Sequence, residues 1–209
     1  DNNNTVKSCN HWRAPVKVGK YTVYASSRRL LNDKSINQGV VPQVGIYLDD
    51  MWMRELSGFA SCGMPCPVKP KWPFLVVDWP DMGVMTDWET NIIVDEAIKH
   101  IKLGKRVEIA CMGGHGRTGT LLAMIKVKLE GITVKDAVES IRETYCDKTV
   151  ESVTQISAIY KVAGEEEPKE KEAKAKDKTT PEKKDEPAKV EAKDEASLDA
   201  VMKAVKDLG

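Results

Sequence analysis

Residues 111–117 combine a cysteine, three glycines and an arginine between an apolar segment and a helix-forming run. Glycines permit positive φ angles and close approach of the main chain, and a helix beginning near Arg117 points its unpaired N–H groups and positive dipole end at the loop. Such a loop can bind a tetrahedral oxyanion. The same field stabilises the thiolate of Cys111, which is the form in which a cysteine acts as a nucleophile.

The side chains that follow favour phosphate as the anion. Arg117 carries a planar guanidinium that can hold two phosphate oxygens at once, and Thr118 brings a hydroxyl beside the thiolate. A single buried cysteine or a single glycine-rich turn is more often structural, but Cys-x5-Arg-Thr-Gly between a strand and a helix is a much narrower pattern. We therefore predict that Cys111, Arg117 and Thr118 are catalytic and that substrate is bound by Arg117 and the intervening residues Met112, Gly113, Gly114, His115 and Gly116.

This pattern resembles the phosphate-binding signature of the cysteine-dependent protein tyrosine and dual-specificity phosphatases. The resemblance covers about residues 20–163 and implies a second motif upstream, a mobile Trp-Pro-Asp loop that carries the general acid. Residues 78–84 contain that motif and place Asp81 at the acid position. Expulsion of a phenolate or alkoxide from phosphorus requires such a proton donor opposite the thiolate. Asp78 is the alternative acid.

A third segment is similar to the glutamine loop of the family, in which two glutamines position the hydrolytic water. Gln155 matches the second glutamine, whereas Glu151 replaces the first. The resemblance therefore implies a catalytic role for Gln155, although a glutamine in a helical stretch is more often solvated. A further departure is Ala110, because the family usually has histidine directly before the nucleophile.

The resemblance implies a phosphoprotein phosphatase that hydrolyses phosphotyrosine, and also phosphoserine or phosphothreonine, through a phosphocysteine intermediate. Relatives that cleave phosphoinositides or RNA 5′-triphosphates share the signature, but the neutral Met112 and the partly charged His115 favour a phosphoprotein. A phosphate-reading module with little turnover and a rhodanese-type sulfurtransferase are the alternatives from other classes, and the latter has no use for Asp81. We expect no metal or other cofactor in the reaction.

The predicted fold is α/β, with a central, mostly parallel sheet flanked by helices as in protein tyrosine phosphatases. Residues 1–19 are expected to be an irregular segment and residues 20–163 the phosphatase domain. Within the domain, β-branched and apolar periodicity predicts strands over 20–25, 43–48, 74–77 and 107–110, and helices over 86–103, from 117, from 133 and over 152–163.

Beyond the domain the composition changes. Residues 164–196 are almost entirely charged residues, alanine and proline, so we expect a disordered linker. Residues 197–209 have a serine cap and an apolar stripe, which predict a short amphipathic helix. It is either a fraying tail or a docking helix that binds a protein partner or folds back.

Charge and cysteine content bear on partners and location. The formal net charge is zero, with 32 basic and 32 acidic residues, which gives no reason to expect nucleic acid or an anionic membrane as a partner. No apolar run has the length of a signal peptide or a membrane span, and a catalytic thiol favours a reducing compartment, so we expect a cytoplasmic, monomeric protein.

Two minor features have open interpretations. Cys9, His11, Cys62 and Cys66 are four potential zinc ligands, but the looser Cys-x3-Cys spacing favours free thiols, with zinc and a Cys62–Cys66 redox pair as the alternatives. The adjacent Arg28–Arg29 pair is interpreted as a solvated turn rather than as a phosphate contact.

Overall fold

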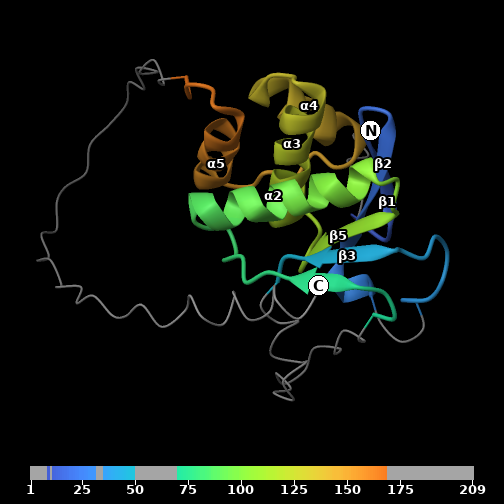
Figure 1. The fold of residues 1–209 in the computed structure, drawn as a ribbon. Helices are drawn as coiled ribbons and strands as arrows, with labels where there is room; N and C mark the ends of the chain where they lie inside the picture. The colour runs from blue at the N-terminus through green and yellow to red at the C-terminus, as the bar shows by residue number, and fades with distance from the viewer. Residues whose placement is uncertain (1–8, 10, 32–34, 50–69, 169–209) are drawn as a thin grey trace, which may run out of the picture. The chain divides into compact units, whose positions relative to one another are not determined.

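The computed structural model describes residues 9, 11–31, 35–49 and 70–168. In this part of the chain a five-stranded sheet has the order β1-β2-β5-β3-β4, with β5 at its centre (Figure 1). Strands β2, β5, β3 and β4 are parallel to one another, and β1 pairs with β2 in the antiparallel sense. The predicted mostly parallel sheet is therefore confirmed. The strands are β1 Ala14–Val18, β2 Tyr21–Ser27, β3 Val44–Tyr47, β4 Phe74–Val76 and β5 Val107–Cys111.

The prediction that residues 1–19 are irregular is wrong for β1. Val16 and Val18 are buried while Lys17 between them is exposed, which is the alternation of a strand with one face on the core. Pro15 lacks an N–H donor and so disfavours a central strand, but an edge strand tolerates it. Pairing with β2 decides the conformation of a segment that is too short and too polar to be identified alone.

Three of the described helices begin at a side-chain cap. Thr86 and Glu89 form a capping box at α2, Ser152 and Gln155 form another at α5, and Thr133 caps α4. Helix α3 is different, because its N-terminus has no side-chain cap. None of the described helices is long and apolar enough to cross a bilayer. The helices are η1 Arg28–Leu30, α2 Asp87–Lys102, α3 Gly116–Glu130, α4 Val134–Thr144 and α5 Val153–Ala163.

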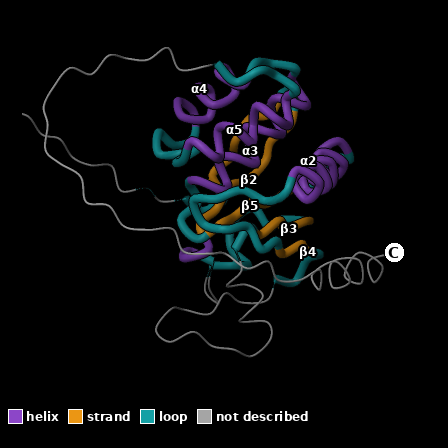
Figure 2. The backbone as a smooth tube through the Cα atoms, turned by 90° about the vertical axis from the view of Figure 1, so that its left-hand side faces the viewer, coloured by secondary structure: helices purple, strands orange, loops and turns teal. Residues whose placement is uncertain are grey.

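Alternate residues of β5 divide the core into two layers. Ile109 and Cys111 join the main apolar cluster with residues of α2, α3, α4 and α5, whereas Ala110 joins a smaller cluster with Leu31 and Tyr47. The helices α2–α5 therefore pack against one face of the sheet (Figures 1 and 2), and α3 contacts both α4 and α5. On the opposite face, Ala110, Tyr47 and Leu31, the residue that follows η1, pack with Trp12, Phe74 and Val76.

A buried polar network lies on that opposite face. Glu108 of β5 is fully buried and accepts hydrogen bonds from Arg13 Nε at 2.8 Å, Ser26 Oγ at 2.9 Å and Tyr47 Oη at 2.9 Å. Burial, with the nearby Glu108 carboxylate, raises the pKa of Tyr47 and keeps its hydroxyl as a donor. These bonds connect β5 to β2, β3 and the segment before β1, which fixes the strand that ends in Cys111.

Part of the predicted organisation cannot be compared with the structure. Cys62, Cys66, most of the predicted linker 164–196 and the predicted helix 197–209 lie outside the described residues.

Candidate active site

The site is built at the carboxyl end of the central strand. Cys111 is the last residue of β5 and is 3% exposed, and the chain then passes through residues 112–115 into α3. A cavity of about 330 Å³ opens above it. The loop residues Met112, Gly113, His115, Gly116 and Arg117 line this cavity together with Cys111 and Asp81.

One close backbone approach and two side-chain hydrogen bonds hold the loop in place. Gly114 has φ +76°, and a Cβ atom there would lie 3.1 Å from the carbonyl oxygen of Ser26, so the position requires glycine. Tyr145 Oη donates to Gly114 O at 2.6 Å, and Ser27 Oγ donates to Met112 O at 2.8 Å. The first N–H groups of α3 have no intrahelical acceptor and no side-chain cap, so they remain available to an anion.

Arg117 is 5% exposed and connects the loop to the Trp-Pro-Asp segment. Its Nη1 donates to Trp79 O at 3.0 Å, and its Nη2 lies 3.3 Å from Oδ1 of Asp81. The buried Nε has no hydrogen-bond partner among the described residues. A buried donor without a partner is costly, and a phosphate oxygen in the cavity would satisfy it.

The Trp-Pro-Asp segment follows β4 as a structured turn. Trp79 is 1% exposed and its Nε1 donates to Gly83 O at 2.9 Å, so the indole anchors the segment in the core. Asp81 beyond it is exposed and lines the cavity, whereas the exposed Asp78 does not line it. Of the two aspartates predicted as candidate acids, Asp81 is therefore the one that faces the cavity.

The other two predicted catalytic residues are buried near the loop. Thr118 lies in the first turn of α3, and its Oγ1 has no hydrogen-bond partner in the described part of the chain. Gln155 uses Oε1 to accept from Glu151 N at 2.8 Å, while its buried Nε2 is unpaired among the described residues. A Cβ atom on Gly116 would lie 3.0 Å from that Nε2, so Gln155 adjoins the loop without lining the cavity.

The pair Arg28–Arg29 departs from the predicted solvated turn. Arg28 is buried, its Nε donates to Asp49 Oδ2 at 2.6 Å and its Nη2 contacts Met112 Sδ at 2.9 Å, so it supports the loop from behind. Arg29 is exposed and lines the cavity. The parallel register of β2 and β5, which places Ser27 beside Cys111, brings η1 to the site. No local pattern in the sequence carries that register.

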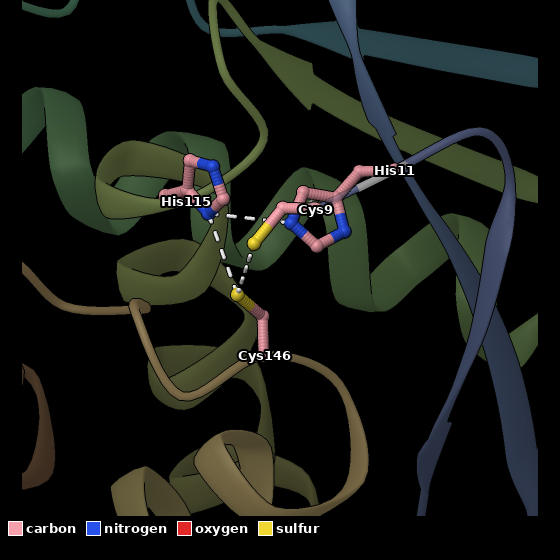
Figure 3. A group of neighbouring side chains, drawn as sticks. All are labelled: Cys9, His11, His115 and Cys146. Atoms are coloured by element: carbon pink, nitrogen blue, oxygen red, sulfur yellow. Dashed lines mark hydrogen bonds between the residues drawn. The ribbon is translucent and has the colours of Figure 1, made fainter. Parts of the chain in front are cut away.

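A second group of side chains adjoins the loop. Cys9, His11, His115 and Cys146 direct their ligand atoms towards one another (Figure 3). Burial raises the pKa of Cys146 to about 11, and burial together with the neighbouring His115 lowers the pKa of His11 to about 4. The sequence suggested Cys9 and His11 as possible zinc ligands. The structure places them beside His115 and Cys146, which the sequence did not suggest.

Comparison with known proteins gives relatives without an assigned function and structures with the same fold. No protein-family model matches the chain. Two uncharacterized proteins of Methanocaldococcus jannaschii, MJECL20 and MJ0215, are 37% and 36% identical to it over 110 residues. The matched region covers 53% of this chain, 69% of MJECL20 and 64% of MJ0215.

Several solved structures superimpose on most of the chain. Tk-PTP in its active form has a TM-score of 0.56 at 18% identity, covering 73% of this chain and 98% of its own. A human tyrosine phosphatase-like serine/threonine/tyrosine-interacting protein has a TM-score of 0.56 at 10% identity, with 73% and 97% coverage. PTPMT1 in complex with PI(5)P has a TM-score of 0.52 at 16% identity, with 72% and 95% coverage. The chain therefore has the protein tyrosine phosphatase fold.

Proposed function

We propose that this chain, which belongs to the same family as the uncharacterized protein MJECL20 of Methanocaldococcus jannaschii, hydrolyses phosphate monoesters on proteins through a phosphocysteine. One observation supports the proposal most strongly. The buried guanidinium of Arg117 is in the loop that follows Cys111, and its Nη2 lies 3.3 Å from the carboxylate of Asp81 across the cavity. The anion-binding Arg117, the nucleophile Cys111 and the acid Asp81 thus line the same cavity.

The first displacement transfers the phosphoryl group to sulfur. The thiolate of Cys111 attacks phosphorus in line, while Arg117 and the N–H groups of the loop bind the equatorial oxygens. The bond from phosphorus to the leaving oxygen breaks, and Asp81 donates its proton to that oxygen. A dephosphorylated side chain leaves, and a phosphocysteine remains.

The second displacement returns the enzyme to its starting state. Asp81, now a carboxylate, takes a proton from a water molecule, whose oxygen attacks the phosphocysteine and releases inorganic phosphate. We assign the unpaired Nε2 of Gln155 to the positioning of this water, and the Oγ1 of Thr118 to hydrogen bonding with the departing thiolate, since both groups are buried beside the loop without other partners among the described residues.

The charge around the cavity favours a substrate with a single phosphate, above all phosphotyrosine. Met112 is neutral, and burial lowers the pKa of His115, so this loop histidine is neutral near pH 7. Glu151 contributes a negative charge to the lining, and among the described residues Arg29 is the one basic lining residue besides Arg117. A phosphoinositide or a 5′-triphosphate carries several more negative charges, for which this lining offers little compensation.

The test is phosphate release from four substrates in reducing buffer: a phosphotyrosine peptide, a phosphothreonine peptide, a phosphoinositide and a triphosphorylated RNA. We expect turnover of the phosphotyrosine peptide by the native chain and none by Cys111→Ser, which keeps a small polar side chain but cannot form the phosphocysteine. Cys62→Ser is the control for replacing another cysteine of the chain by serine. Turnover that survives in Cys111→Ser would contradict the mechanism.

A phosphate-reading module is the second candidate, and one residue favours it. Ala110 stands where the resembling phosphatases usually have histidine, so one group that favours the thiolate is missing. The same experiment separates the two functions. Tight phosphopeptide binding by native chain, with no release of phosphate from any of the four substrates, would establish the reader and refute the enzyme.

A further inference from the structure

We propose that Cys9, His11, His115 and Cys146 bind one Zn²⁺ ion in a closed tetrahedral site beside the phosphate-binding loop. Their four ligand atoms lie within 4.8 Å of one another and point to a common centre (Figure 3). The inference rests on these positions and does not depend on the proposed catalytic activity.

Three of the six separations between ligand atoms match those of a zinc tetrahedron, and the other three are no longer than 4.8 Å. With zinc about 2.3 Å from sulfur and about 2.0 Å from nitrogen, tetrahedral angles place two sulfurs about 3.8 Å apart, sulfur and nitrogen about 3.5 Å, and two nitrogens about 3.3 Å. Here Cys9 Sγ lies 3.7 Å from Cys146 Sγ, and Cys146 Sγ lies 3.4 Å from His115 Nδ1. His11 Nε2 lies 3.2 Å from His115 Nδ1.

The chemistry of the donor set selects zinc among the divalent ions. Two thiolates and two imidazoles form a common structural zinc set, whereas magnesium and calcium require oxygen ligands. Two thiolates balance the charge of the ion, so the occupied site is neutral and can be largely buried without an unpaired charge. Four protein ligands leave no open position, which makes the site structural, and no chemical step is assigned to the ion.

A disulfide between Cys9 and Cys146 explains the same residues less well. Bonded sulfurs lie about 2.0 Å apart, and the observed 3.7 Å separation is a non-bonded one. A disulfide would also leave unexplained why His11 and His115 turn ring nitrogens towards the two sulfurs. Neither Cys9 nor Cys146 is in a disulfide in this structure.

The ligands come from three parts of the chain, and this gives the ion a definite role. Cys9 and His11 precede β1, His115 is the N-cap of α3 within the loop, and Cys146 follows the C-cap Tyr145 of α4. The ion would join all three. It would hold His115 in place and so fix the backbone through which the loop binds phosphate.

The first test is the metal content of the purified native chain after desalting in reducing buffer. We expect about one zinc per chain by elemental analysis. After replacement of zinc by Co²⁺ we expect the absorption of thiolate-to-cobalt charge transfer and of a tetrahedral cobalt ion. Native protein without zinc that also gives no such cobalt spectrum would overturn the proposal.

Variants identify the ligands. Cys9→Ser changes an exposed cysteine and is the variant least disruptive to folding. Cys146→Ser and His11→Ala each remove one further ligand. Each should lose most of the zinc, weaken the charge-transfer band and lower the melting temperature. Cys111→Ser and the double variant Cys62→Ser with Cys66→Ser are matched controls that should retain the metal. Zinc that is lost in the double variant but kept in Cys146→Ser would refute this ligand set.

Two further outcomes are informative. An intact mass lower by two hydrogens, with Cys9 and Cys146 joined in a peptide map of protein kept under reducing conditions, would replace the metal site by a disulfide. Because Cys111→Ser abolishes the proposed turnover yet should keep zinc, failure of the phosphatase proposal and failure of the zinc proposal are distinguished in the same set of proteins.

Discussion

The carboxylate of Asp81 is three-quarters exposed, yet its Oδ1 lies 3.3 Å from the buried Nη2 of Arg117. An ion pair with one exposed partner contributes little to stability, so this contact does not by itself hold the acid segment in place. The burial of Trp79 and the bond from Arg117 Nη1 to Trp79 O do so. In the proposed mechanism, the contact brings the carboxylate of Asp81 next to the phosphate group that Arg117 would bind.

Replacement of Asp81 by asparagine should remove the proton donor and keep the size and shape of the side chain. We expect kcat for a phosphotyrosine peptide to fall by roughly 10²- to 10⁴-fold with little change in KM. The loss should be smaller for p-nitrophenyl phosphate, whose leaving group departs without a proton. Steady-state kinetics with both substrates measures this difference, and Asp78→Asn is the matched control that should remain close to native. Equal losses for the two substrates would argue against general acid catalysis.

Replacement of Glu108 by alanine should destabilise the fold beneath the nucleophile. The change leaves the guanidinium of Arg13 buried without its anion, which costs about 3–5 kcal/mol in comparable buried pairs. Urea unfolding measures the loss. The double variant Glu108→Ala with Arg13→Met removes both charges and should recover part of the stability. A loss below about 1 kcal/mol in the single variant would show that water replaces the network.

Replacement of Gly114 by alanine should damage the loop beyond the cost of its backbone conformation. Gly104→Ala is a matched control, because Gly104 has φ +71° with no atom within 4 Å of an added Cβ, whereas Gly114 has φ +76° with His11 Cβ at 3.0 Å. Both variants should lose about 1–2 kcal/mol for the left-handed conformation. Only Gly114→Ala should also lower kcat/KM. Equal stability and unaffected turnover in the pair would mean that the loop adapts freely.

Replacement of Gln155 by alanine should affect stability and the second displacement together. Gln155 forms the capping box of α5 with Ser152, and loss of a cap costs about 1 kcal/mol. If its Nε2 positions water, rapid-mixing kinetics should show a full burst of leaving group followed by slower turnover. Thr133→Ala removes the cap of α4 and should cost similar stability without slowing hydrolysis. A reduced burst in Gln155→Ala would place its effect before the phosphocysteine.

The local elements were predictable because each is encoded by neighbouring residues. The run from β5 through the loop into α3 is contiguous, so apolar periodicity, glycines and Arg117 identify it without knowledge of the rest of the chain. The caps Thr86 and Thr133 likewise act within one turn of their helices. The fold class followed from the alternation of such elements, and the structure confirms it. The catalytic roles of Cys111 and Asp81 stay predictions.

Contacts between distant segments could not be predicted in this way. The strand character of residues 14–18 depends on pairing with β2, and the burial of Arg28 depends on the parallel register of β2 beside β5. The group Cys9, His11, His115 and Cys146 joins positions up to 137 residues apart, of which the sequence suggested two. Side-chain type and local backbone preference are local properties, so the residues that could do chemistry were identifiable from the sequence alone. Which of these residues meet depends on strand order and on the packing of helices across the sheet, so it became known from the folded chain.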